Sequence, residues 1–186
     1  MKKLLLLLMI LPMIGCGQNI NIPDANFKAV LVKNPSINTN GDTEIQVSEA
    51  AAYTAFINCT YWGISDLTGI EYFTALADLD CSNNKLTTLD VSNNIALTYL
   101  SCNGNQLTTL DVSNNTALES LYCDNNNLTS LDVSGATRLH LLFCSDNQLT
   151  SLDVSNNLEL SALGCFKNKF DCDALKKKGN DGYNFE

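Results

Sequence analysis

Cysteines recur at a fixed interval in this chain of 186 residues, and thiols can bind metals or form disulfides. Five of them are 21 residues apart, and Cys59 precedes the first by 22: Cys59, Cys81, Cys102, Cys123, Cys144 and Cys165. If each interval is one structural repeat, the thiols form a straight row, which cannot supply a tetrahedral metal shell. Parallel Cβ vectors also disfavour disulfides, so we expect reduced thiols in a core. Cys172 lies outside the row and could cap the end or pair with Cys165.

Acidic residues and one histidine are the other candidates for chemistry. His140 is the sole histidine and has no evident nucleophile partner, so we expect a surface residue and no enzyme. Four aspartates recur with the same period, each two residues before a serine: Asp90, Asp111, Asp132 and Asp153. We expect them to accept hydrogen bonds from the turn N–H groups that follow, and a cation between neighbouring carboxylates is the alternative.

The stretch NTNGDTEIQVSE has the spacing of a twelve-residue EF-hand loop. Its ligand positions one, three, five, seven and twelve would be Asn38, Asn40, Asp42, Glu44 and Glu49. The loop departs from the motif at position one, where a charge is missing, and at position six, where Thr43 replaces glycine. Two interpretations follow: a loop that only shapes its surroundings, or a weak Ca²⁺ site with a dissociation constant of about 10⁻⁴–10⁻³ M. No other cofactor is expected.

The cysteines belong to a longer repeat, L-x-x-L-x-C-x-x-N-x-L. Its first copy is Leu76, Leu79, Cys81, Asn84 and Leu86, and four more copies follow in register to Phe170. This pattern resembles the leucine-rich repeat family, with cysteine in the third leucine position. The resemblance implies a repeat solenoid with a parallel β-sheet on its concave face and a mostly irregular back.

The alternation of residues supports the same architecture. Leu79 and Cys81 should point inward and Asp80 outward, which is the period of a strand with one buried face. The repeated asparagine should bond the backbone of its own and the neighbouring coil. On the back of each coil, Leu89 and Val91 should point inward.

The segment before the repeats should close the first coil, which would otherwise expose its core. Asp24 can cap a helix that carries Phe27, Val30 and Leu31 at helical spacing and ends before Pro35. A second helix is expected from Val47 to about Phe56. The region resembles the helical cap of internalin-like bacterial repeat proteins.

The chain begins with two lysines and an apolar run, Leu4–Ile14, too short to span a bilayer. The run ends in Gly15-Cys16, which resembles the lipobox of bacterial lipoproteins and implies lipidation of Cys16. Gly17, rather than aspartate, then favours the outer membrane of the cell envelope. Loss of Lys2 and Lys3 would shift the formal net charge from −9 to −11, which argues against nucleic-acid partners.

We therefore divide the chain into a lipoprotein signal peptide (1–15), a cap (16–52), about six repeats (53–170) and a C-terminal cap or tail (171–186). Large aromatic and acidic residues occupy outward strand positions, where an apolar patch suits a binding face. The candidate partner-binding residues are Tyr99, Tyr122, Asp124, Leu141, Phe143, Phe166, Asp78 and Asp80. We expect a non-enzymatic cell-surface module that binds a protein; a carbohydrate-binding or purely structural surface protein is the alternative.

Overall fold

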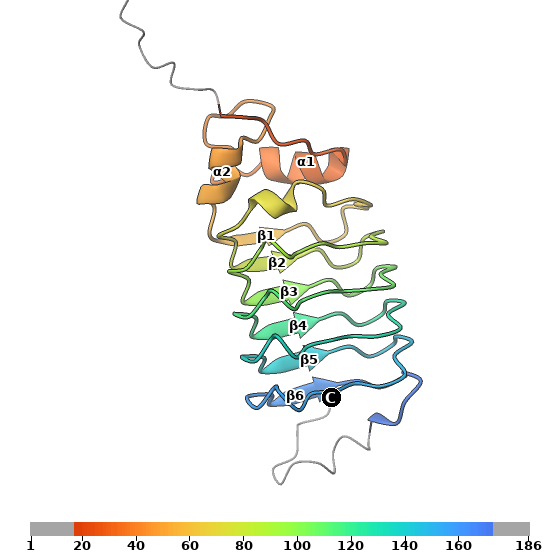
Figure 1. The fold of residues 1–186 in the computed structure, drawn as a ribbon. Coiled ribbons are helices and arrows are strands. Elements are labelled where there is room, and N and C mark those ends of the chain that lie inside the picture. Colours follow the sequence, from red (N-terminus) through yellow and green to blue (C-terminus); the bar gives the residue numbers. More distant parts are fainter. Residues whose placement is uncertain (1–16, 173–186) are drawn as a thin grey trace, which may run out of the picture.

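The computed structural model describes residues 17–172, and there the chain winds into one stack of coils (Figure 1). Each coil contributes one short strand to the same side, and the six strands are β1 (Phe56–Asn58), β2 (Asp78–Asp80), β3 (Tyr99–Ser101), β4 (Ser120–Tyr122), β5 (Leu141–Phe143) and β6 (Ala162–Gly164). They pair in parallel and in sequence order from β1 to β6. The predicted solenoid with a parallel sheet is confirmed.

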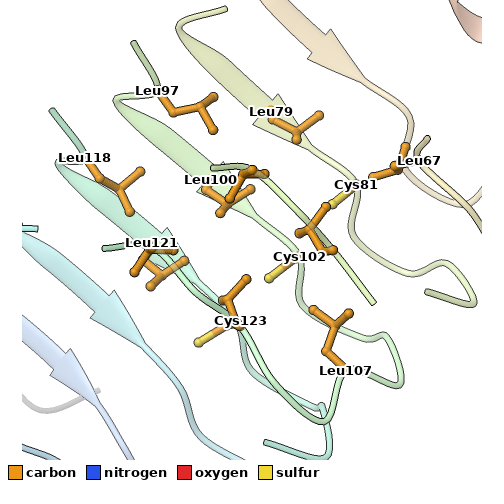
Figure 2. Packing of buried hydrophobic residues seen from close by; sticks show 14 of the residues in the cluster. Leu67, Leu79, Cys81, Leu97, Leu100, Cys102, Leu107, Leu118, Leu121 and Cys123 are labelled. Atoms are coloured by element: carbon orange, nitrogen blue, oxygen red, sulfur yellow. The ribbon is translucent and has the colours of Figure 1, made fainter. Parts of the chain in front are cut away.

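The core is a set of straight columns, because each residue lies beside its counterpart one repeat away. Leu79 is in register with Leu100, and Leu100 with Leu121. These leucines and the cysteines two residues after them have no solvent exposure. Figure 2 shows Cys81, Cys102 and Cys123 in one line beside the leucines. Dense burial of small and branched side chains is the main source of stability in such a stack.

In every coil after the first, an asparagine connects that coil to the one before. The side-chain nitrogen of Asn105 donates to the carbonyl oxygens of Cys102 and of Cys81, at 3.0 and 3.1 Å. Its Oδ1 accepts from the backbone N–H of Leu86 at 3.0 Å. The same pattern recurs at the other positions of this asparagine column, Asn84, Asn126, Asn147 and Asn168. The predicted role of these residues is confirmed.

The back of the solenoid contains a second set of bridging asparagines that we did not predict. Asn115 donates to the carbonyl oxygens of Val91 and Asn94, at 3.0 and 2.9 Å. Asn94 and Asn157 do the same in their coils, and Ala136 takes this position in the coil between. These amides satisfy backbone groups in a region with little regular sheet.

The exposed aspartates on the back behave as expected. Asp90 accepts a hydrogen bond from the backbone N–H of Ser92 at 2.9 Å, and the equivalent aspartates do so with their own serines. Isolated bridges also pair Asp90 with Asp111 and Asp111 with Asp132. Leu89 and Val91 point inward, as predicted.

Two helices close the end of the stack beyond β1 (Figure 1). Helix α1 (Ala25–Val32) begins at Asp24, whose carboxylate accepts from the backbone N–H groups of Asn26 and Phe27. Helix α2 (Val47–Ala52) is shorter than predicted, because Tyr53 is already extended and leads the chain into β1. A short 3₁₀ helix, η1 (Ile70–Tyr72), lies on the back of the first coil and was not predicted. Among residues 17–172, no helix is long and apolar enough to cross a membrane.

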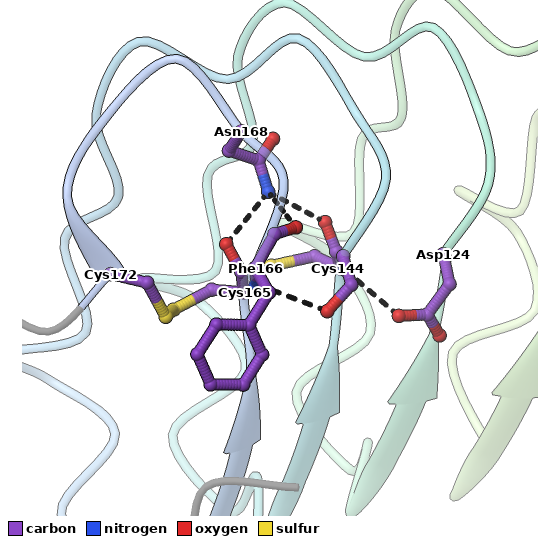
Figure 3. Close-up of a disulfide and its surroundings, with 7 residues drawn as sticks. Asp124, Cys144, Cys165, Phe166, Asn168 and Cys172 are labelled. Atoms are coloured by element: carbon purple, nitrogen blue, oxygen red, sulfur yellow. Dashed lines mark hydrogen bonds between the residues drawn. A yellow bond between two sulfur atoms is a disulfide. The ribbon is translucent and has the colours of Figure 1, made fainter.

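The cysteine column consists of free thiols in five coils and a disulfide in the last. Five of its members are free and buried: Cys59, Cys81, Cys102, Cys123 and Cys144. Burial raises the pKa of the Cys59, Cys102 and Cys144 thiols to about 12. The sixth, Cys165, forms a disulfide with Cys172, seven residues later (Figure 3). Of the two alternatives for Cys172, the pairing with Cys165 is the one observed, because the chain returns after the last repeat to place Cys172 beside Cys165. The expectation of reduced thiols holds at the other five positions of the column.

Candidate functional site

The outward residues of the six strands form one continuous face of the sheet. Strand β2 illustrates the alternation, with Asp78 and Asp80 partly exposed on either side of buried Leu79. The outward positions, taken from β1 onward, are Phe56, Asn58, Thr60, Asp78, Asp80, Ser82, Tyr99, Ser101, Asn103, Ser120, Tyr122, Asp124, Leu141, Phe143, Ser145, Ala162, Gly164 and Phe166. This set contains large aromatics and three aspartates but no lysine or arginine.

Three of the predicted aromatics contact one another and form an aromatic row. The rings of Tyr122 and Phe143 are stacked, with centroids 5.1 Å apart and planes inclined by 4°. Tyr99 continues the row, with its centroid 5.5 Å from that of Tyr122. Tyr122 and Phe143 lie directly opposite each other in the β4–β5 register, so the row is straight there and steps diagonally only towards Tyr99. The three side chains are all partly exposed.

One aromatic residue outside the predicted set, Phe56, contacts the row at Tyr99. Phe56, on β1, is 43% exposed, and its ring lies edge-on to that of Tyr99 with centroids 6.5 Å apart. Phe56 pairs with Asp78 and Asp78 pairs with Tyr99, so the two rings meet across the intervening strand. The sequence signal is the register position that Phe56, Asp78 and Tyr99 share.

The remaining predicted residues lie on the same face but at different places along it. Leu141 lies on β5, two residues before Phe143, and is partly exposed. Phe166 follows β6 and is exposed, and its backbone N–H donates to the hydroxyl of Ser145 at 3.1 Å. Leu141 and Phe166 thus add two further apolar side chains to the face, on β5 and just after β6.

The carboxylates of the face differ in their surroundings. Burial raises the pKa of Asp124, with a contribution from the nearby Asp146, although the backbone N–H of Ser145 donates to Asp124 and opposes the shift. Asp80 accepts from both the backbone N–H and the hydroxyl of Ser82, at 3.0 and 2.6 Å. Asp78 accepts from the hydroxyl of Thr98 at 3.0 Å. Asp78 and Asp80 therefore place negative charge beside the aromatic row near β1.

The EF-hand-like loop holds its predicted residues mostly by internal hydrogen bonds. Asn38, Asn40 and Asp42 each accept from a backbone N–H two or three residues later, which shapes three successive turns. Glu49 accepts from the backbone N–H groups of Thr39 and Asn40 with one oxygen. Its other oxygen accepts from Gln46 N in a capping box.

The charged side chains of this loop already have partners. Desolvation raises the pKa of Glu49, but the hydrogen bonds from Gln46, Thr39 and Asn40 outweigh it and leave the pKa lowered. Amide groups of Asn40 and Gln46 donate to Asp42, and Glu44 forms an ion pair with Lys28 at 2.7 Å. Within residues 17–172, no group of three or more His, Cys, Asp or Glu side chains has a metal-binding arrangement. The loop fits a cation only in part, and calcium binding stays a prediction.

Two other predicted residues lie apart from the sheet face. His140 is on the surface at the strand margin, where its Nε2 lies 3.3 Å from a carboxylate oxygen of Glu159. Cys16, the predicted lipidation site, lies outside the described residues.

The comparisons with known proteins agree with this architecture. A family model described as leucine-rich repeats (2 copies) matches residues 95–135. Among curated proteins, none matches the chain at a significant level.

Solved internalin structures from Listeria monocytogenes are similar to this chain. InlF is 23% identical with a TM-score of 0.76, over 88% of this chain and 49% of that one. InlC2 is 20% identical with a TM-score of 0.57, over 83% and 79%. The functional domain of InlJ, described as including a cysteine ladder, is 26% identical with a TM-score of 0.43, over 86% and 55%. The chain spans about half the length of InlF and of the InlJ domain. The fold of this chain is that of a leucine-rich repeat solenoid.

Proposed function

We propose that this leucine-rich repeat solenoid is a non-enzymatic interaction module that binds a protein through the outward face of its sheet. The observation that carries the proposal is the aromatic row, Tyr99, Tyr122 and Phe143, with rings in contact on three neighbouring strands. Contiguous aromatic surface left partly in water is typical of protein interfaces, where tyrosine also supplies a hydrogen-bonding tip.

The alternative role of the row is to stabilise the sheet. A cross-strand aromatic pair contributes about 0.5–1.5 kcal/mol, so some stabilisation is expected in either case. The sheet, however, is already specified by the asparagine column and by a buried leucine on every strand except β1, where Ile57 takes its place. The coils also vary at outward positions while their inward positions stay constant, which fits a surface adapted to a ligand.

A glycan is the second candidate ligand, because aromatic rings beside carboxylates also suit sugars. Phe56 and Tyr99 flank Asp78, and Tyr122 lies near Asp124 on the same face, so this arrangement exists here. We favour a protein because the ring contacts of the row extend over three neighbouring strands. A structural surface protein without a ligand is the third candidate.

We further propose, from the sequence pattern at Cys16, that the module is held at the bacterial cell envelope by a lipid anchor. Such an anchor would present the sheet face to proteins of the envelope or of the surroundings.

Binding arrays can decide between these candidates. The labelled chain is applied in parallel to a glycan array and to an array of purified extracellular and membrane-protein domains. The double variant Tyr122→Ala, Phe143→Ala removes the stacked pair. The matched control, Ile95→Ala, Leu158→Ala, removes two exposed apolar residues from the turns on the back.

We expect a protein target that is lost with the first variant and kept with the control, while both variants melt within a few degrees of the parent. Glycan capture that depends on the same pair would support the second candidate. If the Tyr122→Ala, Phe143→Ala variant captured the protein as well as the parent does, the aromatic row would not be the binding site.

A further inference from the structure

At the β1 end of the sheet face, Tyr99 of the aromatic row and the neighbouring Phe56 line a small hollow that also contains a carboxylate. A shallow notch of about 300 Å³ is lined by Phe56, Asp78 and Tyr99. The two rings stand nearly perpendicular, at 87°, with their centroids 6.5 Å apart. Asp78 lies between them in the register of β1, β2 and β3. A carboxylate is therefore flanked by two aromatic walls.

The carboxylate of Asp78 has unused capacity for a ligand. Its Oδ1 accepts from the hydroxyl of Thr98, which fixes the side chain. Among residues 17–172, no donor is paired with Oδ2 of Asp78, and no lysine, arginine or histidine forms an ion pair with Asp78 or Asp80. Two carboxylates on one short strand without a cation give this part of the face a negative potential.

The same potential acts on the ring that lines the notch. Burial raises the pKa of the Tyr99 hydroxyl; a hydrogen bond with Ser101 opposes the rise, and the charges of Asp80 and Asp78 add to it. A cation placed in the notch would meet both the carboxylates and the negative faces of the rings.

The neighbouring groove gives a useful contrast. Phe56 also lines a groove that contains Lys33 and Trp62, and there the chain's own Lys33 ammonium lies 5.0 Å from the centroid of the Trp62 ring. That aromatic surface already has a cation. The Asp78 notch, on the other side of Phe56, has the rings and the counter-charge, but no cation from the described part of the chain.

We propose that the Asp78 notch binds the ammonium group of a lysine side chain presented by the protein partner. This inference rests on the proposed function and names the chemistry of one contact within it. An ammonium group is compact and donates in three directions, so it can meet two perpendicular rings and Oδ2 of Asp78 together. A planar guanidinium would stack on one ring only, and a neutral side chain would leave the carboxylate unpaired.

The test uses small probes, so that it does not depend on the identity of the partner. Nα-acetyl-lysine amide and its neutral counterpart, Nα-acetyl-norleucine amide, are titrated into the ¹⁵N-labelled full chain, and amide shifts are followed by NMR. Nα-acetyl-arginine amide is the third probe. We expect saturable shifts at Phe56, Asp78 and Tyr99 with the lysine probe, and binding about tenfold weaker for norleucine, since the cation–π and ion-pair contacts are lost.

Two variants locate the effect. Asp78→Asn removes the charge but keeps an oxygen for the Thr98 hydroxyl, so the fold should be retained, and lysine binding should fall to the norleucine level. Asp111→Asn, which removes an exposed carboxylate from the back, should bind the lysine probe like the parent. Equal binding of lysine and norleucine, tighter binding of arginine than of lysine, or normal lysine binding by Asp78→Asn would each overturn the proposal. Any of these results leaves the array experiment free to support protein binding through Tyr122 and Phe143.

Discussion

The side-chain nitrogen of Asn126 donates to the carbonyl oxygen of Cys102, 24 residues earlier, at 3.1 Å. The same nitrogen donates to Cys123 in its own coil, and Oδ1 of Asn126 accepts from the backbone N–H of Leu107. The nitrogen also donates to the carbonyl oxygen of Asp124 at 3.2 Å, so one amide connects two coils through four backbone groups. Repeat solenoids derive cooperativity from such contacts between neighbours, because each repeat touches only the repeats beside it.

We predict that Asn126→Ala lowers the free energy of unfolding by about 3 kcal/mol, because buried backbone groups lose their partner. Urea unfolding followed by circular dichroism would measure the change. Asn127→Ala is the matched control, since Asn127 is exposed, and its effect should be within about 0.5 kcal/mol. Equal stability of the two variants would contradict the role of Asn126 in connecting the two coils.

The free thiols should resist modification until the chain unfolds. Burial raises the pKa of Cys59, Cys102 and Cys144 to about 12, so a rise in pH from 7 to 9 should not accelerate labelling of the native protein. Mass spectrometry after unfolding without reductant should find the five column thiols labelled, but not Cys165 or Cys172. A column thiol that stays unlabelled in the unfolded, unreduced chain would instead belong to another disulfide.

The same pKa values give the stability a defined dependence on alkaline pH. An unfolded thiol ionises at a pH of about 8.5, whereas the folded thiols stay protonated until the pH reaches about 12. The contribution of the buried thiols to the free energy of unfolding is therefore fully present below pH 8.5 and is lost as the pH rises from 8.5 to 12. The urea concentration at the unfolding midpoint should therefore be lower at pH 10 than at pH 8. The difference between the two midpoints should be smaller for the variant Cys102→Ala.

Much of the fold could be predicted because the repeat places chemically equivalent residues in equivalent places. The asparagine column and the inward Leu-x-Cys pattern were visible in five copies, so their roles followed from the geometry of one coil. The second asparagine set, at Asn94, Asn115 and Asn157, was also visible in the repeated Ser-Asn-Asn, but we assigned only the aspartate of that turn. Features present once were harder to predict: the end of α2 depends on the extended conformation of Tyr53, and the Cys165–Cys172 pair depends on how the chain leaves the last coil.

In the candidate site, too, contacts between equivalent repeat positions could be predicted and other contacts could not. The stacking of Tyr122 on Phe143 follows from their identical repeat position, whereas the contact of Phe56 with Tyr99 spans two strands. Side chains long enough to reach across an intervening strand make contacts that a pairwise register does not predict.

A backbone conformation common to the coils gives the next prediction. The residue two positions after each column cysteine has a positive φ, and in most coils it is Asn, Gly or Asp, as at Asn83, Gly104 and Asn125. Tyr61 occupies this position in the first coil with φ = 60° and is 79% exposed. Because a left-handed conformation costs a bulky residue about 1–2 kcal/mol, Tyr61→Asn should stabilise the fold by about 1 kcal/mol. The control Tyr61→Ala also removes the ring, but alanine is not suited to a left-handed backbone, so its gain in stability should be smaller. An equal gain in stability for the two variants would show that the effect comes from loss of the ring and not from the backbone conformation.

The sequence pattern at Cys16 predicts a lipid anchor, although this residue lies outside the described part of the chain. The variant Cys16→Ala should lose the mass of the lipid and move from the membrane fraction to the soluble one, because the lipidated residue itself is removed. Gln18→Ala, two residues away, should stay with the membrane. Unchanged mass and membrane association of Cys16→Ala would refute lipidation.

The loop between α1 and α2 gives the last prediction. Asn38, Asn40 and Asp42 form successive turns of the kind that an EF-hand loop requires, and Glu49 is held at the beginning of α2. With a dissociation constant of about 1 mM, 10 mM Ca²⁺ would stabilise the fold by about 1.4 kcal/mol, so a small rise in melting temperature is expected. Mg²⁺ should have less effect, because it demands a tighter octahedral geometry.

Two variants test whether that rise comes from the loop. Glu49→Gln should abolish the calcium response but also weaken the hydrogen bonds that Glu49 accepts from Thr39, Asn40 and Gln46, so its melting temperature should fall without calcium. Asp42→Asn removes a charge and keeps an acceptor for the backbone N–H of Glu44, so it should lose the response at nearly unchanged stability. If the parent chain shows no shift at 10 mM Ca²⁺, the loop serves only to join the two helices, and the hydrogen bonds to Glu49 and Asp42 are sufficient to hold it.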